Sequence, residues 1–157
     1  EHAKGIAHAL LLGETFAAGE KILVILGDNI TTGTLVPHVD AFRQQKAGAR
    51  VLLKKVGDPE RFGVAAIDEK QVVQIDEKPE KPRSDYAVIG YYMYDQKVFD
   101  IIRAIKPSVR GELEITSVNN AYIELSEFQH GILEGDWTDA GTLESLQYAN
   151  QMMLGHE

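Results

Sequence analysis

Two aspartates, far apart in the sequence, are placed where they could bind a metal ion together. Asp28 follows the most apolar run of the chain, residues 21–26, after Gly27, and Asp139 precedes a Gly-Thr pair that could open a helix. In open α/β sheets, ligands bind beyond the carboxyl ends of the strands. Mg²⁺ usually takes one or two protein carboxylates and completes its shell with phosphate and water. The alternatives are structural: Asp28 and Asn29 would form a turn, and Asp139 would cap a helix.

A second group of charged residues follows another expected strand. Glu77, Lys78 and Pro79 are consecutive, and Pro79 should end the strand and hold Lys78 in an extended conformation. Lys78 would then be a point charge suited to phosphate, while Glu77 would face the other side or reach sugar hydroxyls. The alternative is a solvated charged turn, because residues 80–83 carry three further charges.

Two more positions could contact a phosphorylated ligand. Arg110 precedes acidic residues that are expected to begin a helix, and its guanidinium could bind phosphate through two hydrogen bonds. Gly63 could let a ligand approach the backbone closely. A surface arginine and a turn glycine are the structural alternatives.

The elements that would position these residues alternate between helix and strand. Apolar residues at helical spacing predict helices, and short apolar or alternating runs predict strands. The expected helices cover residues 4–18, 36–46, 97–105, 112–125 and 143–153. The expected strands cover residues 21–26, 51–56, 63–68, 71–77, 86–94 and 131–134, with the first as a buried parallel strand and 63–77 as a hairpin. This order predicts one α/β domain with a Rossmann-like mixed sheet flanked by helices.

The composition is that of an ordinary folded protein with an acidic balance. The chain has 157 residues, is 44% hydrophobic and carries a net charge of -8. One domain is therefore expected, and non-specific nucleic-acid binding, which needs a basic surface, is excluded. The absence of cysteine excludes disulfides, zinc–thiolate sites and cysteine nucleophiles. No apolar run approaches the roughly 20 residues of a membrane span, and no signal peptide is visible. We expect a cytoplasmic protein with no membrane partner.

Six short motifs occur in one order along nearly the whole chain. They are Leu26-Gly27-Asp28-Asn29, Arg61-Phe62-Gly63-Val64, Asp76-Glu77-Lys78-Pro79, Asp85-Tyr86-Ala87-Val88-Ile89-Gly90, Arg110-Gly111-Glu112-Leu113-Glu114-Ile115-Thr116 and Trp137-Thr138-Asp139-Ala140-Gly141-Thr142. In this order they resemble the sugar-1-phosphate nucleotidylyltransferases. The last two motifs are most similar to the glucose-1-phosphate thymidylyltransferase branch.

The resemblance implies an activity, a cofactor and roles for the candidate residues. A nucleoside monophosphate would pass from a nucleoside triphosphate, dTTP in this branch, to glucose 1-phosphate, with release of pyrophosphate and no covalent intermediate. The implied catalytic positions are Asp28, Lys78 and Asp139, with Mg²⁺ bound by the two aspartates. The implied substrate-binding positions are Gly5 at the nucleobase and Asn29, Gly63, Glu77, Lys78, Val88 and Arg110.

Two departures from the family pattern bear on the activity of these residues alone. Phe62 stands where many thymidylyl enzymes have Tyr. The family's Gly-Gly-x-Gly-Thr-Arg loop would precede Glu1, so residues 1–157 would be a partial nucleotidyltransferase catalytic domain, incomplete at its N-terminus. We expect the isolated chain to have little or no activity, and its exposed sheet edges to favour a homo-oligomer. The alternative is a non-catalytic sugar-nucleotide-binding or regulatory subunit of the same fold.

Overall fold

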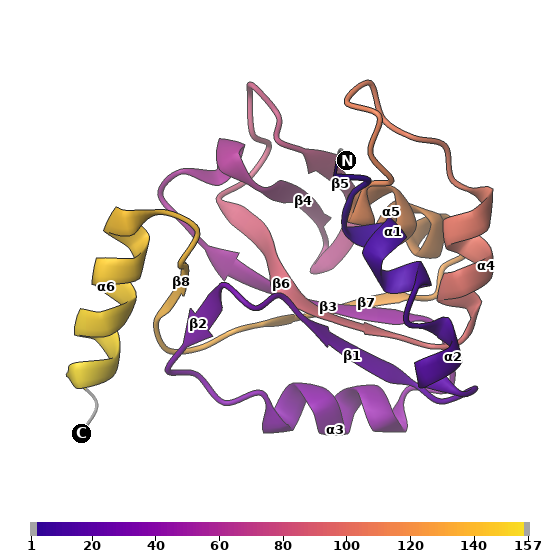
Figure 1. Ribbon diagram of the computed structural model, residues 1–157, viewed down its shortest axis with the longest axis horizontal. Coiled ribbons are helices and arrows are strands. Elements are labelled where there is room, and N and C mark those ends of the chain that lie inside the picture. The colour runs from indigo at the N-terminus through magenta and orange to yellow at the C-terminus, as the bar shows by residue number, and fades with distance from the viewer. Residues whose placement is uncertain (1–2, 156–157) are drawn as a thin grey trace.

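A six-stranded sheet and a two-stranded sheet form the framework of the molecule (Figure 1). A computed structural model describes residues 3–155 of the chain. Its strands are β1 Ile22–Ile25, β2 Asn29–Thr31, β3 Ala49–Lys55, β4 Gly63–Asp68, β5 Gln71–Glu77, β6 Tyr86–Tyr94, β7 Phe128–Ile132 and β8 Trp137–Asp139. Its helices are α1 Ile6–Leu11, α2 Glu14–Ala17, α3 Val36–Gln44, α4 Lys97–Ala104, α5 Ile115–Glu124 and α6 Leu143–Leu154, with a 3-10 turn at Pro59–Arg61.

The large sheet is mixed, as the sequence predicts, and β6 is its central strand. The sheet has the order β5-β4-β6-β3-β7, and β1 also pairs with β6. β3 pairs along the length of β6, while β4 and β1 pair with its beginning and its end. The β3–β7 pair is parallel and the other pairs of this sheet are antiparallel.

Strand β6 has a hydrophobic core on each of its faces, because successive side chains of a strand point to opposite sides. Val88, Tyr92 and Tyr94 belong to one core, which also takes residues from α1, α4 and α5. Ile89 and Met93 belong to the other core, with residues of α3. Helices therefore flank both faces of the sheet, which confirms the expected fold class (Figure 1).

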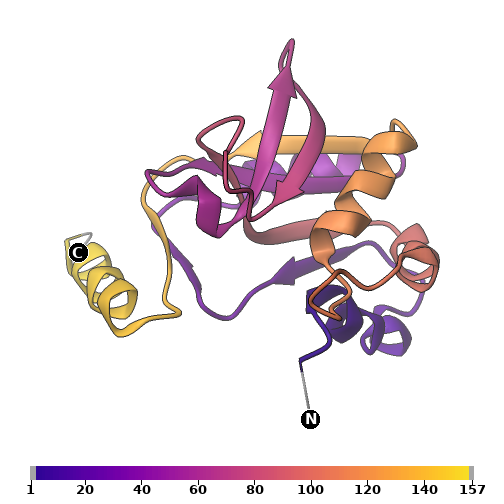
Figure 2. The same ribbon diagram turned by 90° about the horizontal axis from the view of Figure 1, so that it is seen from above.

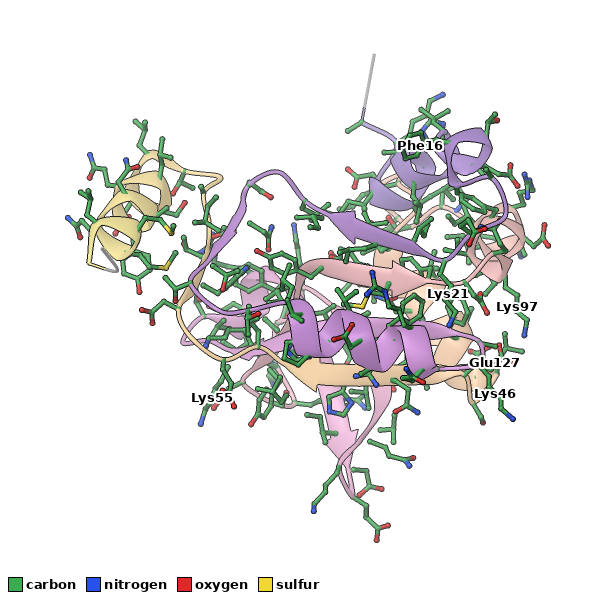
Figure 3. The ribbon with its side chains drawn as sticks, turned by 90° about the horizontal axis from the view of Figure 1, so that it is seen from below. Phe16, Lys21, Lys46, Lys55, Lys97 and Glu127 are labelled. Carbon is green, nitrogen blue, oxygen red and sulfur yellow. The ribbon has the colours of Figure 1, made fainter. Side chains whose placement is uncertain are left out.

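Ion pairs and lysine contacts tie the helices to the sheet at its edges. Lys97, the first residue of α4, pairs with Glu127, which precedes β7, at 2.6 Å (Figure 3). Lys21 donates to the carbonyl oxygen of Phe42 at 3.1 Å, at the C-terminal end of α3. Carbonyl groups at a helix end have no partner within the helix, so a lysine there satisfies them.

The second sheet is small and was missed by the sequence prediction. β2 and β8 pair antiparallel, with Asn29 opposite Asp139, and α6 follows β8 and stands apart from the large sheet (Figure 2). Thr142 caps α6, because its hydroxyl accepts from the Ser145 N–H at 3.1 Å and Ser145 reciprocates. The helix-cap alternative for Asp139 is therefore wrong.

The prediction that residues 21–26 form a buried parallel strand is wrong in both respects. β1 pairs antiparallel with β6 and, among the described residues, uses only one of its edges. Its side chains alternate between half-buried and exposed, and Leu23 and Ile25 are 40% and 49% exposed. An apolar run predicts burial on both faces of a strand, but only one face of β1 packs against the core.

Three element boundaries also differ from the expected ones. The helix expected at residues 4–18 is broken at Gly13 into α1 and α2. The helix expected at 112–125 begins at Ile115, so Arg110 lies in the loop before it. The last strand of the large sheet ends at Ile132 rather than covering residues 131–134. The hairpin at β4–β5 and the long strand β6 are confirmed.

Candidate active site

One cavity of about 420 Å³ gathers the candidate residues from distant parts of the chain. It lies where β4, β5 and β6 meet the loop before β2 and the end of β8. The positions from the sequence analysis that line it are Asp28, Asn29, Gly63, Glu77, Lys78, Val88, Arg110 and Asp139. Gly5 is not in its lining, although the next residue, Ile6, is.

The two aspartates are neighbours across the small sheet. The Ala140 N–H donates to the main-chain oxygen of Asp28 at 2.7 Å, next to the Asn29–Asp139 pair. Asp28 lies in the turn between β1 and β2, closed by an N–H bond from Asn29 to the oxygen of Leu26 at 3.1 Å. The turn alternative for Asp28 is therefore correct, and the turn also delivers Asp28 to the cavity.

Each aspartate has one carboxylate oxygen held by a neighbouring side chain. The amide of Asn29 donates to Oδ1 of Asp28 at 2.9 Å, and the guanidinium of Arg61 donates to Oδ2 of Asp139 at 3.2 Å. The other oxygen of each carboxylate has no such contact among residues 3–155. Two anchored carboxylates with one open oxygen each suit a hard cation that takes its remaining ligands from phosphate and water.

Arg61 was not singled out by the sequence analysis except as part of a motif. It pairs with Asp58 at 2.7 Å as well as with Asp139, and lies over the ring of Phe62. The hydrogen bond with Asp58 is the main cause of a raised Arg61 pKa, and the charge of Asp139 adds to it. Arg61 therefore stays cationic beside the aspartate.

Lys78 adopts a conformation that the sequence analysis did not expect. Its φ is 45°, in the left-handed region, rather than the extended value predicted from Pro79. The Lys78 N–H donates to the carbonyl oxygen of Phe62 at 3.0 Å, next to the Gly63–Glu77 pair of the hairpin. Residues held in sparsely populated backbone regions cluster at functional sites, and Lys78 lines the cavity.

Glu77 is held by side chains from the opposite wall of the cavity. Its Oε2 accepts from the hydroxyl of Thr116 in α5, and its Oε1 lies 3.6 Å from the Arg110 guanidinium. Gly63 pairs with Glu77 and with Val88 in the sheet, where an added Cβ would lie 3.1 Å from the Thr116 hydroxyl. The absence of a side chain at Gly63 keeps this floor of the cavity open.

Arg110 is surrounded by carboxylates. It contacts Glu114 at 3.0 Å and lies 3.7 Å from Glu112, in addition to Glu77. The hydrogen bond with Glu114 is the main cause of its raised pKa. The Glu114 side chain also accepts from the hydroxyl of Ser108 at 2.7 Å. The guanidinium is thus held at the cavity wall, with 43% of the side chain exposed.

Three residues of the cavity have contacts or positions that the sequence does not predict. Trp137 and Thr116 occur inside recognised motifs, but their contacts with Asn29 and Glu77 join residues far apart in the chain. Tyr92 lines the cavity from β6. Burial raises the Tyr92 pKa, with the charges of Glu77 and Asp28 adding to the effect, so its hydroxyl stays a neutral donor.

Gly5 has a structural explanation in the fold. Its φ is 92°, and an added Cβ would lie 2.4 Å from the Leu113 oxygen. Its neighbours bond to Leu113 on both sides, with Ala7 N–H to oxygen at 3.2 Å and Leu113 N–H to the Lys4 oxygen at 2.9 Å. Gly5 therefore lets the start of α1 pack against the strand-like segment before α5, and contact with a nucleobase stays a prediction.

Among residues 3–155 there is no group of three or more His, Asp or Glu residues that could hold a metal ion. A cation at Asp28 and Asp139 would thus take its remaining ligands from water or from substrate oxygens. Within the same range, no helix is long and apolar enough to cross a membrane.

Comparisons with known proteins identify the family of the chain. The family model described as nucleotidyl transferase matches residues 1–155, so the chain belongs to the nucleotidyl transferase family. A glucose-1-phosphate thymidylyltransferase of Xanthomonas campestris pv. campestris strain B100 is 45% identical over 151 residues, which is 92% of this chain and 50% of the relative.

Solved structures share the fold as well. One is described as a glucose-1-phosphate thymidylyltransferase of Bacillus anthracis in complex with a sucrose, and it has a TM-score of 0.91 and 51% identity to this chain. The match covers 97% of this chain and 62% of the chain in that structure. A UDP-glucose pyrophosphorylase complexed with UDP-glucose has a TM-score of 0.88 at 23% identity, and the match covers 100% of this chain and 64% of the chain in that structure. At this identity the similarity supports only a shared fold. The chain spans about half the length of the curated relatives it matches.

Proposed function

We propose that the protein containing this chain transfers a nucleoside monophosphate from a nucleoside triphosphate to a hexose 1-phosphate. The main observation behind this proposal is that a single cavity is lined by both aspartates, Lys78, Glu77 and Arg110. Carboxylates for a cation, cations for phosphate and an acceptor for sugar hydroxyls are the three kinds of group that this reaction needs.

The charge of the cavity supports a metal-dependent reaction. Its lining holds five carboxylates, those of Asp28, Glu77, Glu112, Glu114 and Asp139, against three cations, those of Arg61, Lys78 and Arg110. This leaves a net charge of −2, which repels a phosphorylated substrate. A divalent cation held by Asp28 and Asp139 would balance that charge, and Mg²⁺ is the ion that such carboxylates bind together with phosphate oxygens. When bound, Mg²⁺ supplies neutralising charge to the phosphates.

The reaction is an in-line displacement without a covalent enzyme intermediate. An oxygen of the sugar phosphate attacks the α-phosphorus of the triphosphate, the new P–O bond forms, and the bond to the β-phosphate breaks to release pyrophosphate. The contribution of the chain is positioning and charge stabilisation. Lys78 would hold the sugar phosphate, and Arg110 would add charge beside it.

Glu77 and the floor of the cavity would select the sugar. With Thr116 donating to one oxygen of Glu77, the other faces Arg110 at 3.6 Å and can accept from a sugar hydroxyl. Gly63 and Val88, paired in the sheet, would contact the flat side of the ring. The names of the relatives favour glucose 1-phosphate and dTTP as the substrates.

The test is pyrophosphate release by the complete protein with Mg²⁺ and glucose 1-phosphate, with dTTP, UTP, ATP, CTP and GTP assayed in parallel. We expect the fastest release with dTTP and a loss of at least a hundredfold in Asp28→Asn. Release with another base would keep the reaction and change the branch. A folded protein that releases pyrophosphate with none of the five would overturn the proposal in favour of a non-catalytic subunit.

A further inference from the structure

The side chain of Asn29 is bound on nearly all sides by the protein itself. Its Oδ1 accepts from the Gly90 N–H and from the Trp137 indole N–H, each at 2.9 Å. Its Nδ2 donates to Oδ1 of Asp28 at 2.9 Å. An asparagine amide has two acceptor positions and two donor hydrogens, so both acceptor positions and one hydrogen are used.

These bonds fix the orientation of the amide. Turning it over would place its NH₂ group against two N–H donors, from Gly90 and Trp137, and its oxygen against the Asp28 carboxylate. Each of the three contacts would then be repulsive, because a donor would face a donor or an acceptor an acceptor. The oxygen of Asn29 must therefore face β6 and β8, and its NH₂ group must face Asp28.

The backbone around Asn29 is built to receive this side chain. A Cβ added at Gly90 would lie 2.5 Å from Nδ2 of Asn29, so the amide occupies the space that any other residue would fill there. The main-chain oxygen of Asn29 also accepts from the Tyr91 hydroxyl at 3.1 Å, and its backbone pairs with Asp139. Asn29 thus joins β2 to the central strand and to β8.

We infer that Asn29 is a positioning residue, which holds the Asp28 carboxylate by one oxygen so that the other is presented to a cation. Arg61 does the same for Asp139 through its Oδ2. Asn29 differs from Arg61 in being locked to two strands of the fold. The inference rests on the proposed function, because it assumes that the two aspartates bind the cation. A substrate contact of Asn29 is limited to its one remaining amide hydrogen.

The first test is the affinity of the complete protein for Mn²⁺ alone, followed through the electron paramagnetic resonance signal of the free ion. Groups that orient metal ligands change affinity by about 10–100-fold when removed. We expect Asn29→Ala to weaken Mn²⁺ binding at least tenfold. Gly90→Ala, which displaces the Asn29 side chain without removing it, should also weaken binding, and it serves if Asn29→Ala does not fold.

Asn120→Ala is the matched control. Asn120 exchanges two hydrogen bonds with the backbone of Ile75, at 2.9 and 2.8 Å, and does not line the cavity. The substitution Asn120→Ala removes an asparagine with a structural role, so it should lower thermal stability and leave Mn²⁺ affinity unchanged. Equal Mn²⁺ affinities of Asn29→Ala and the wild type would overturn the inference.

A second readout is independent of any cation. The indole N–H resonance of Trp137, identified as the one lost in Trp137→Phe, should shift in Asn29→Ala and stay in place in Asn120→Ala. An unshifted resonance would contradict the hydrogen bond on which the inference depends.

The Mn²⁺ and pyrophosphate measurements distinguish an error in the proposed function from an error in this inference. Asp28→Asn should abolish Mn²⁺ binding if the aspartates bind the cation. Wild-type protein that binds no Mn²⁺ and releases no pyrophosphate would overturn both proposals, whereas tight binding that Asp28→Asn abolishes and Asn29→Ala spares would overturn this inference alone.

Discussion

Glu77 illustrates how single side chains of this site obtain their roles from partners. Its position at the end of a strand indicated a carboxylate that could reach sugar hydroxyls, but the Thr116 hydroxyl that holds it is 39 residues away. Likewise, Asn29 and Trp137 are 108 residues apart. The sequence indicated which polar residues could belong to a site, since each motif could be recognised locally. It could not predict their partners, because those contacts depend on how β5, α5 and β8 are packed.

Removal of the Glu77 charge should weaken binding of the sugar substrate in particular. A hydrogen bond to a charged group is worth about 1.5–3 kcal/mol, which corresponds to roughly 10–100-fold. We expect Glu77→Gln to raise KM for the hexose 1-phosphate about tenfold or more, with KM for the nucleoside triphosphate nearly unchanged. Steady-state kinetics with each substrate varied in turn would measure both, and an equal rise in the two KM values would speak against a sugar contact.

The presence of the helices and strands was predicted better than their pairing and burial. The hairpin β4–β5 follows from two alternating runs and strand β6 from a long aromatic run, and both are present. The prediction for β1 failed, because an apolar run does not reveal how many other strands pair with a strand or how many of its faces are buried. The extended conformation expected for Lys78 from Pro79 is also wrong, because its φ is 45°.

Asp95 joins three elements at the end of β6 and should be important for stability. Its carboxylate accepts from the Gly48 N–H at 2.6 Å, from the Tyr122 hydroxyl at 2.7 Å and from the Lys97 N–H at 3.1 Å. Asp95→Ala leaves these donors unpaired, so we expect a loss of about 3 kcal/mol in the free energy of unfolding by urea. Asp100→Ala, at an 88% exposed side chain, is the control and should change it by under about 0.5 kcal/mol. Equal losses in the two variants would contradict this role.

The packing of α3 against β7 should make stability sensitive to mild acid. Burial and the charge of Arg50 lower the pKa of His38 and of His130 below 6.5, although Glu134 partly opposes the shift at His38. A lowered folded pKa means that the neutral forms stabilise the fold above pH 6.5, and that this stability is lost as the pH falls through the folded values. We expect the free energy of unfolding to drop between pH 7 and pH 5. The double variant His38→Gln/His130→Gln should show a flatter dependence, and an unchanged slope would contradict the assignment.

At the scale of the molecule, β1 has an unpaired edge and an exposed apolar face among the described residues. Leu23 and Ile25 of β1 are exposed, and uncovered strands invite pairing with another chain. We expect a chain of these 157 residues to self-associate, and Leu23→Lys/Ile25→Lys to make it monomeric in light scattering. Leu154→Lys, at another exposed leucine, should leave association unchanged. A wild-type chain that is monomeric at high concentration would contradict the prediction.

The central claim is that Asp28 and Asp139 act as one unit in nucleotidyl transfer. The most direct measurement is a double-mutant cycle on kcat for pyrophosphate release by the complete protein, with Asp28→Asn, Asp139→Asn and both together. Residues that act as a unit are strongly non-additive, so we predict that the double variant is no slower than the slower single variant. Losses that multiply in the double variant would show that the two aspartates act separately, and would contradict the account.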